Sequence, residues 1–298
     1  MNFDWLVAIA YFAGWRLVRS LPEKFAYSTF ENLGRFTLKR DGARMQRLRS
    51  NLQRVCPEKS QSEMDLLMAQ AVSSYMRYWC DTFRSPDWSK SRISSTVTVT
   101  REELLTAPMR DGRGVVIALP HAGNWDHAGA YFCAMGFKLV TVAERLKPEA
   151  LFNKFLQYRQ NMGMEVLALD GRSMATLMQR ARDGALIALV ADRDLSRSGV
   201  DVNFFGYPAR MPAGPALLAV RTGIPLVTAF VSYTTTGIHV EFNSVAIPQD
   251  GTDEERVATV VQTCADHFQS GISKAPQDWH MLQRIWIDGD FQERGAAS

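Results

Sequence analysis

Cysteine is scarce in this sequence, and the few that occur lie far apart. Cys56, Cys80, Cys133 and Cys264 form no C-x-x-C pair, which excludes a readable zinc site or thioredoxin-like motif. Cys133 is a conceivable nucleophile, although free cysteines are among the residues most often buried. We therefore expect reduced thiols that pack in the core of a cytoplasmic protein.

Long apolar runs are also missing. The uncharged stretch near the start extends only from Trp5 to Trp15, whereas a helix that spans a membrane needs roughly 20 apolar residues. No segment combines a basic start, a long apolar core and a small-residue cleavage site, so a signal peptide is not expected. We expect a protein that stays on the cytoplasmic side.

Histidine is rare as well, with five in the chain. No H-E-x-x-H or similar spacing connects them, so the sequence gives no support for a metal site. We interpret His127, His239, His267 and His280 as packing or surface residues. His121 differs because of the residues around it.

The net charge of +3 is unevenly distributed. Residues 1–54 carry ten Lys or Arg against four acids, a local charge of +6, which leaves −3 on the rest. Such a segment attracts anionic lipid headgroups or nucleic acid. Because no nucleic-acid-binding module or interleaved strand aromatics accompany it, nucleic acid is not expected as a partner.

The N-terminal region has a helical apolar pattern that predicts two or three helices over residues 3–53. One interpretation packs the apolar face on the rest of the protein, and the other places it on an anionic membrane surface, with Trp15, Arg16 and Arg19 near headgroups. The face consists of Trp5, Ile9, Phe12, Trp15 and Val18.

From Val115 onward, short apolar runs alternate with helical segments, which is typical of α/β proteins. Runs rich in Val, Ile and Leu favour parallel strands covered on both faces. We predict an α/β fold: a mixed, mostly parallel central sheet flanked by helices, with an N-terminal helical segment that associates with membranes. The expected strands are 115–119, 138–142, 164–168, 186–190, 225–230 and 239–242, and a further helix is expected at 64–83.

The length fits one domain over residues 1–298. Within it we expect a basic, amphipathic helical region at 1–54 and a catalytic α/β core at 110–286.

The segment Pro120-His-Ala-Gly-Asn-Trp-Asp126 directly follows the expected strand 115–119. Ligands of such sheets bind beyond the carboxyl ends of strands. A helix that starts near Asn124 keeps the His121 imidazole neutral and able to accept a proton, and Asp126 is a candidate to fix its tautomer. Since no Ser or Cys nucleophile adjoins His121, direct transfer through a general base is favoured. The structural alternative is that His121 caps the loop and Asp126 complements the helix dipole.

The segment resembles the signature block of the lysophospholipid acyltransferase superfamily, specifically its lipid A biosynthesis acyltransferase branch. Further blocks occur in the order of that branch, and together they cover residues 5–286 or so. They include Ser74-Tyr-Met-Arg-Tyr-Trp79, Ala143-Glu-Arg-Leu-Lys-Pro148, Asp192-Arg-Asp-Leu195, Phe204-Phe-Gly206, Arg210-Met-Pro-Ala-Gly-Pro215 and Asp278-Trp-His-Met-Leu-Gln283.

Within the branch, these blocks are most similar to the actinobacterial enzymes that acylate phosphatidylinositol mannosides. The resemblance implies transfer of a palmitoyl-type chain from acyl-CoA, a donor substrate and not a cofactor, to the 6-hydroxyl of the inositol-2-linked mannose. It also implies a peripheral protein at the cytoplasmic face of the membrane and no covalent acyl-enzyme. The alternatives are a lipid A-type or other lipid acceptor, an acyl-CoA thioesterase, and a non-catalytic lipid-binding protein.

By the same resemblance, the family's catalytic His and motif Asp fall on His121 and Asp126. Its second acidic residue falls on Asp192, where the mannoside enzymes carry the longer Glu. Asp192 closes the strand 186–190, and so it competes with Asp126 as the partner of His121.

Other residues that the resemblance marks are candidates for substrate binding. An Arg side chain is suited to hold a phosphate of a lipid headgroup or of coenzyme A, a surface ion pair being the alternative for Arg145. For Arg193 the plain interpretation is that it neutralises Asp192 and Asp194 on either side of it. The apolar segments 203–206 and 211–215 are candidates to line an acyl groove, with core packing as the alternative. The binding candidates are Asn124, Glu144, Arg145, Arg159 and Arg193.

Overall fold

The computed structural model describes residues 3–143, 149–169 and 173–289, with side chains from Tyr11 onward except that of Leu151. The helices are α1 (Phe3–Ser20), α2 (Glu23–Arg40), α3 (Ala43–Val55), α4 (Gln61–Arg84), α5 (Lys90–Ser95), α6 (Glu103–Arg110), α7 (Trp125–Ala134), α8 (Glu149–Asn161), α9 (Ser173–Arg182), α10 (Gly214–Thr222) and α11 (Asp253–Lys274), with short 3₁₀ helices η1 (Ser85–Asp87) and η2 (Pro276–Asp278). The strands are β1 (Val97–Thr100), β2 (Val115–Leu119), β3 (Leu139–Ala143), β4 (Glu165–Ala168), β5 (Leu186–Val190), β6 (Val200–Phe204), β7 (Tyr207–Met211), β8 (Leu226–Tyr233) and β9 (Ile238–Val245).

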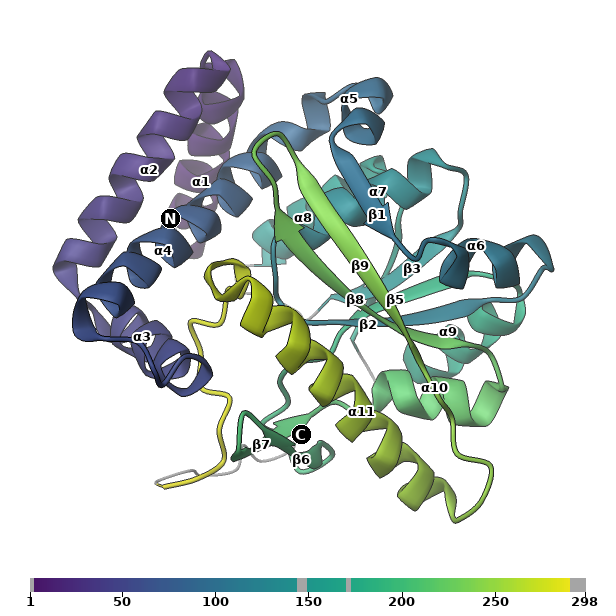
Figure 1. Cartoon of the computed structure of the whole chain (residues 1–298). Coiled ribbons are helices and arrows are strands. Elements are labelled where there is room, and N and C mark those ends of the chain that lie inside the picture. The colour runs from purple at the N-terminus through teal and green to yellow at the C-terminus, as the bar shows by residue number, and fades with distance from the viewer. Residues whose placement is uncertain (1–2, 144–148, 170–172, 290–298) are drawn as a thin grey trace.

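A seven-stranded sheet in the order β1-β9-β8-β2-β5-β3-β4 forms the centre of the molecule (Figure 1). All neighbouring strands pair in parallel except β8 and β9, which form an antiparallel hairpin. The predicted α/β fold with a mostly parallel sheet is confirmed, and all six expected strands occur within a few residues of their predicted bounds. The carboxyl ends of β2 and β5 lie side by side, since Leu119 pairs with Val190.

Alternate residues of the buried strands face two separate cores, as the two-residue period of a strand requires. On β2, Val116 and Ala118 pack in the core beneath α9, α10 and α11, whereas Ile117 and Leu119 pack in the core beneath α6 and α7. Helices on both faces explain why this strand is apolar at every position.

The N-terminal helices pack around α4, beside the sheet (Figure 1). Helix α4 begins with a capping box in which Ser60 and Glu63 bond each other's backbone N–H groups. Trp15 is 4% exposed, and its indole donates to the Phe83 carbonyl at 2.9 Å. The alternative that places Trp15 near headgroups is therefore wrong, because this side chain anchors α1 to α4.

Other apolar side chains of these helices point to solvent. Leu17, Phe25, Leu33 and Phe36, which are not part of the predicted apolar face, are each at least half exposed. In the described part of the chain, none of the helices has the length and apolar character needed to cross a membrane.

The segment 200–211 is an antiparallel hairpin of β6 and β7 that the sequence analysis missed. Phe204 and Met211 are fully buried in the core beneath α11, and Pro215 lies in the first turn of α10. The core alternative is therefore correct for Phe204 and Met211, whereas Asn203 and Gly206 are exposed. The residues of 203–206 and 211–215 line none of the five described cavities, which therefore give no support to the candidate acyl groove at this place.

Candidate active site

His121 lies immediately beyond β2, at the carboxyl edge of the sheet. The turn that carries it depends on Gly123, whose φ of 57° is left-handed and whose added Cβ would lie 2.5 Å from the Val231 carbonyl oxygen. The Gly123 N–H donates to the Asp278 carbonyl at 2.8 Å, and the His280 N–H donates to the His121 carbonyl at 2.7 Å. The end of η2 and the residues after it therefore hold the loop at two points.

The His121 ring pairs with Asp192, which follows β5. Nδ1 of His121 lies 2.6 Å from Oδ1 of Asp192, and the His121 backbone N–H donates to Oδ2 at 3.0 Å. A carboxylate accepts hydrogen bonds, so Nδ1 carries the proton and the lone pair of the neutral ring resides on Nε2. The His121 side chain is 39% exposed while that of Asp192 is fully buried, which leaves the ring accessible and its orienting acid enclosed.

The environment of Asp192 keeps it ionised. Burial by itself raises the pKa of its carboxyl group, but the charge and hydrogen bonds of His121 and the indole of Trp279 outweigh burial and lower it. Trp279 Nε1 donates to Oδ2 at 3.0 Å. A permanent anion here stabilises the imidazolium that forms when His121 accepts a proton.

Asp126 does not contact the ring, contrary to its predicted role as a tautomer-fixing partner. Nε of Arg159 donates to its Oδ1 at 2.8 Å, and the Tyr78 hydroxyl donates to Oδ2 at 3.2 Å. Burial opposes the charge of Arg159, yet Asp126 raises the pKa of that guanidinium. The pair is nearly buried, with the Asp126 side chain 4% and that of Arg159 20% exposed.

Asn124 has a structural role at the start of α7. It is the N-cap of α7: its Oδ1 accepts from the His127 N–H at 2.9 Å, and its Nδ2 donates to Asp81 at 3.3 Å. Its side chain is 1% exposed, so the structure does not favour the predicted contact with substrate. Asp81 also accepts hydrogen bonds from Tyr27 and Tyr233, which ties α2 and β8 to the start of α7.

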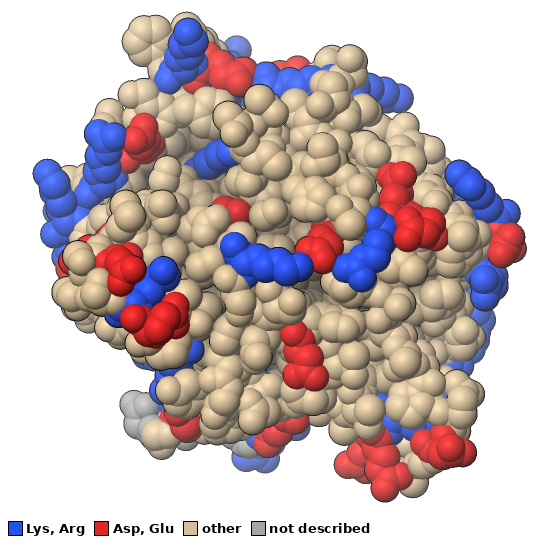
Figure 2. Space-filling view, viewed as in Figure 1, with Lys and Arg blue, Asp and Glu red and all other residues tan. Residues whose placement is uncertain are grey.

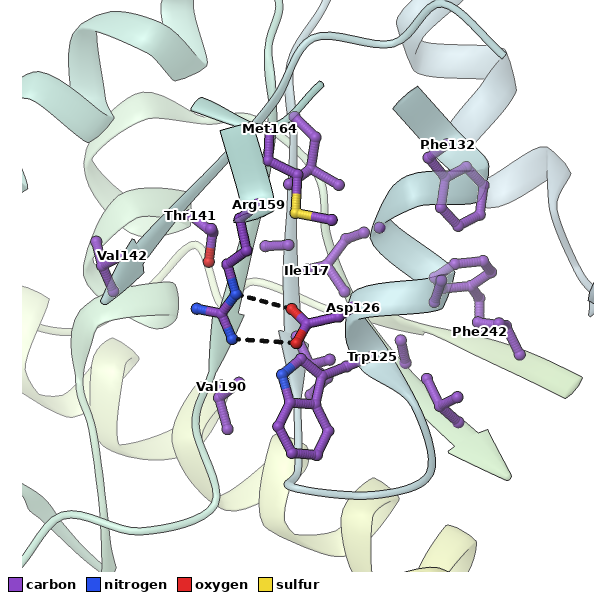
Figure 3. Close-up of a pocket in the computed structure, with 18 residues that line it drawn as sticks. Ile117, Trp125, Asp126, Phe132, Thr141, Val142, Arg159, Met164, Val190 and Phe242 are labelled. Carbon is purple, nitrogen blue, oxygen red and sulfur yellow. Dashed lines mark hydrogen bonds and ion pairs between the residues drawn. The ribbon is translucent and has the colours of Figure 1, made fainter. Parts of the chain in front are cut away.

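An apolar pocket lies between the sheet and α7 (Figure 3). It adjoins residues 120–124, the loop that carries His121, which we call the histidine loop. The space between the lining atoms of the pocket, counted together with the part that opens to solvent, is about 600 Å³. The Asp126–Arg159 pair is its charged part, and Trp125 joins it to the loop because its ring lines the pocket and packs edge-on against His121 at 5.6 Å between centroids. The apolar lining includes Ile117, Phe132, Val142, Met164, Val190 and Phe242.

The remaining sequence-predicted residues are not all brought together. Glu144 and Arg145 lie outside the described residues. Arg193 is partly buried just beyond Asp192 and has interactions of its own in the protein. Burial raises the pKa of the Cys133 thiol to about 11, which favours the packing interpretation of this residue over a nucleophile.

Two residues of the site were not predicted individually. Tyr78 and Trp279 lie inside sequence blocks that carried the family resemblance, but nothing local to them indicates their contacts. Their partners Asp126 and Asp192 are 48 and 87 positions away. The one available signal was their place inside those blocks.

Comparison with known proteins gives consistent matches. A family model described as bacterial lipid A biosynthesis acyltransferase matches residues 2–287. A relative from Mycolicibacterium smegmatis named phosphatidylinositol mannoside acyltransferase is 40% identical over 291 residues, covering 97% of this chain and 94% of the relative. A relative of the same name from Mycobacterium tuberculosis is 38% identical over 298 residues, covering 98% of this chain and 91% of the relative.

Proposed function

The chain belongs to the bacterial lipid A biosynthesis acyltransferase family, and we propose that it transfers a palmitoyl-type chain from acyl-CoA to a phosphatidylinositol mannoside. As a member of this family it is an acyltransferase that acts on glycolipids. The proposed acceptor position is the 6-hydroxyl of the inositol-2-linked mannose. The name of the relatives supports this acceptor, and the pairing of His121 with Asp192 supports the chemistry.

In the proposed mechanism, His121 is the general base. Nε2 takes the proton of the acceptor hydroxyl as that oxygen attacks the thioester carbonyl carbon. The carbon–sulfur bond then breaks, and the imidazolium returns the proton to the leaving thiolate, so coenzyme A departs as a thiol. Asp192 stabilises the imidazolium throughout. Acyl transfer is direct, and no acyl-enzyme forms.

The apolar pocket is proposed to hold the acyl chain of the donor. Burial of each methylene is worth about 0.8 kcal/mol, so a dry apolar pocket next to the base rewards a long chain. Most of the lining comes from the strands and from α7, which supports discrimination by pocket depth. The Asp126–Arg159 pair is proposed to mark the boundary between the acyl chain and the polar end of the site.

The N-terminal helices are proposed to bind the cytoplasmic face of the membrane. Phe25 and Phe36 of α2 are 67% and 53% exposed, and basic residues Lys39 and Arg40 occupy its last turn. Figure 2 shows basic side chains projecting at the edge of the molecule over this helix. Exposed aromatics beside cations suit an anionic lipid surface.

Because Trp15 anchors α1 in the core, point substitutions test membrane binding better than deletion of the first helix. We expect F25S/F36S to lose flotation with anionic liposomes. The control M135S removes an exposed apolar side chain from the end of α7, 43% exposed, and should float normally. Equal flotation of both variants would contradict the proposed surface.

The acceptor is tested by mass spectrometry of products after incubating the protein with palmitoyl-CoA. Parallel reactions contain a mannosylated phosphatidylinositol, a lipid A precursor, or water alone. The proposal predicts a palmitoylated mannoside. Faster acylation of the lipid A precursor, or palmitate release that no acceptor competes with, would identify the rival acyltransferase or thioesterase instead. A non-catalytic lipid-binding protein would form no product in any reaction.

A further inference from the structure

We propose that Trp279 is a positioning residue that holds the Asp192 carboxylate in the orientation that pairs it with His121. This inference rests on the proposed role of His121 as the base. Among the described hydrogen bonds and ring contacts, none joins the Trp279 indole to the His121 ring, and Trp279 acts through the acid.

The hydrogen bonds of Asp192 divide unequally between its oxygens. Oδ1 receives the ring N–H of His121, and Oδ2 receives two donors, the His121 backbone N–H and the Trp279 indole N–H. Among the described residues, the indole is the one donor to this carboxylate that does not come from His121. Without the indole, every hydrogen bond that orients the carboxylate would come from His121, the residue that the carboxylate itself is meant to orient.

The indole itself has little freedom to move. Trp279 is fully buried, and its backbone forms a bridge with Ala122 in the histidine loop. On one side of it, Asp278 accepts hydrogen bonds from Ser74 and from the Tyr233 N–H. The position of the indole is therefore fixed by residues 276–280, the C-terminal segment, which in turn is hydrogen-bonded to α4 and β8.

Removal of this donor changes the base in a predictable direction. A carboxylate that has lost one hydrogen bond is less stable as an anion, so it holds the imidazolium of His121 more tightly. Protonation then inactivates the base at a higher pH. Other ionisable groups of this part of the protein include Arg193 next to Asp192, His280 and Asp278 near the C-terminus, Asp126 with Arg159 from α7 and α8, and Tyr78 from α4.

Trp286 provides a matched control in the same cluster. It is 2% exposed and packs on Phe204 with 5.6 Å between ring centroids, while Trp279 packs on the same ring at 6.0 Å. The indole nitrogen of Trp286 has no hydrogen-bond partner among the described residues. Substituting Phe at either position removes similar volume, but only at 279 does it remove a bonded N–H.

The test is the pH dependence of kcat/KM for palmitoyl transfer by W279F, W286F and H121A. We expect W279F to lose roughly tenfold at neutral pH, mainly in kcat. Its acidic limb should move upward by about half a pH unit or more. W286F should stay near the native profile. A W279F profile that matches W286F would overturn the inference.

The H121A arm separates this inference from the proposed function. Native activity in H121A would contradict the proposal that His121 is the base, independently of the result for Trp279. An inactive H121A together with a native-like W279F would support His121 as the base and contradict only the proposed role of the indole.

If W279F fails to fold, the native tryptophan can be observed directly. In protein labelled with ¹⁵N in the indoles of its seven tryptophans, one indole signal should move strongly in D192N. That signal should be unaffected in W286F. Seven signals that are indifferent to D192N would overturn the inference as clearly as the kinetics.

Discussion

Nδ1 of His121 lies 2.6 Å from Oδ1 of Asp192, although 71 positions separate the two residues in the chain. The parallel pairing of β2 with β5 brings them together, because each residue follows its strand at the same edge of the sheet. One side chain is accessible and the other is fully buried. This combination presents a single lone pair to substrate with its tautomer already chosen.

Substitution of Asp192 by Asn should lower kcat by roughly 10³ to 10⁴. The neutral amide no longer fixes the tautomer of His121 or stabilises the imidazolium. The control is D194N, since Asp194 is held by the Ser196 N–H of its own loop at 2.8 Å. Initial rates of palmitoyl transfer measure both variants, and a D192N rate similar to that of D194N would contradict the pairing.

The Asp126–Arg159 pair should contribute to folding as a unit. R159A leaves a nearly buried carboxylate with the Tyr78 hydroxyl as its remaining donor, and we expect a loss of about 3 to 5 kcal/mol in the free energy of unfolding. The double variant D126N/R159Q should recover part of that loss. Urea denaturation measures both.

The surface pair of Arg35 with Glu31, whose side chains are 67% and 51% exposed, is the control. R35A should leave stability nearly unchanged. A double variant less stable than R159A would show that the two residues do not act as a unit.

Filling the pocket should shorten the preferred acyl chain. Ala229 lines the pocket and is 4% exposed, so A229L occupies space that the chain is proposed to use. We expect transfer of palmitate to fall about fifteen- to sixtyfold relative to a chain two or three carbons shorter. Competition between acyl-CoA donors of different length gives this ratio.

The matched substitution is A118L, on β2 but in the opposite core. It should reduce stability without changing the preference for chain length. An equal shift of preference in A118L would mean that the pocket does not hold the acyl chain.

Two buried histidines should make the protein less stable in acid. Burial lowers the pKa of His127 to about 4 and that of His280 to about 3, below the ordinary value near 6.5. As the pH falls below about 6.5, the unfolded chain binds these protons and the folded protein does not. Each group therefore lowers the free energy of unfolding by up to about 1.4 kcal/mol per pH unit down to its folded pKa.

The readout is the slope of the unfolding free energy between pH 7 and pH 5. Burial raises the pKa of Asp81 and Asp278, which gives a slope of opposite sign, so native protein must be compared with H127N. The variant should have a smaller loss in acid. L105A, at a fully buried apolar site, should lower stability and keep the native slope. An H127N slope equal to the native one would refute the assignment.

The sequence was sufficient for most of the sheet. β2 and β5 were predicted at their observed bounds because strands covered on both faces are apolar throughout. β1 was missed because Val97 to Thr100 is a short, alternating and half-exposed edge strand. The hairpin at 200–211 was missed because its buried aromatics resemble the lining of a groove as much as a core.

The partners within the site could not be predicted from sequence. Asp126 and Asp192 were equally plausible acids for His121, since both follow or begin an element near the same edge. The different roles of the two acids depend on Arg159, which forms an ion pair with Asp126, and on Trp279, which donates a hydrogen bond to Asp192. Both contacts join elements that are distant in sequence, so the spacing of residues along the chain does not predict them.

The most direct test of the account is the rate of palmitoyl transfer from palmitoyl-CoA to a mannosylated phosphatidylinositol by native protein and by H121A. Intact-protein mass spectra should be recorded during turnover. The account predicts a loss of at least about 10³-fold in H121A and no acyl group on the native protein. Near-normal transfer by H121A, or a palmitoylated protein that forms and decays at the rate of turnover, would contradict direct transfer through His121.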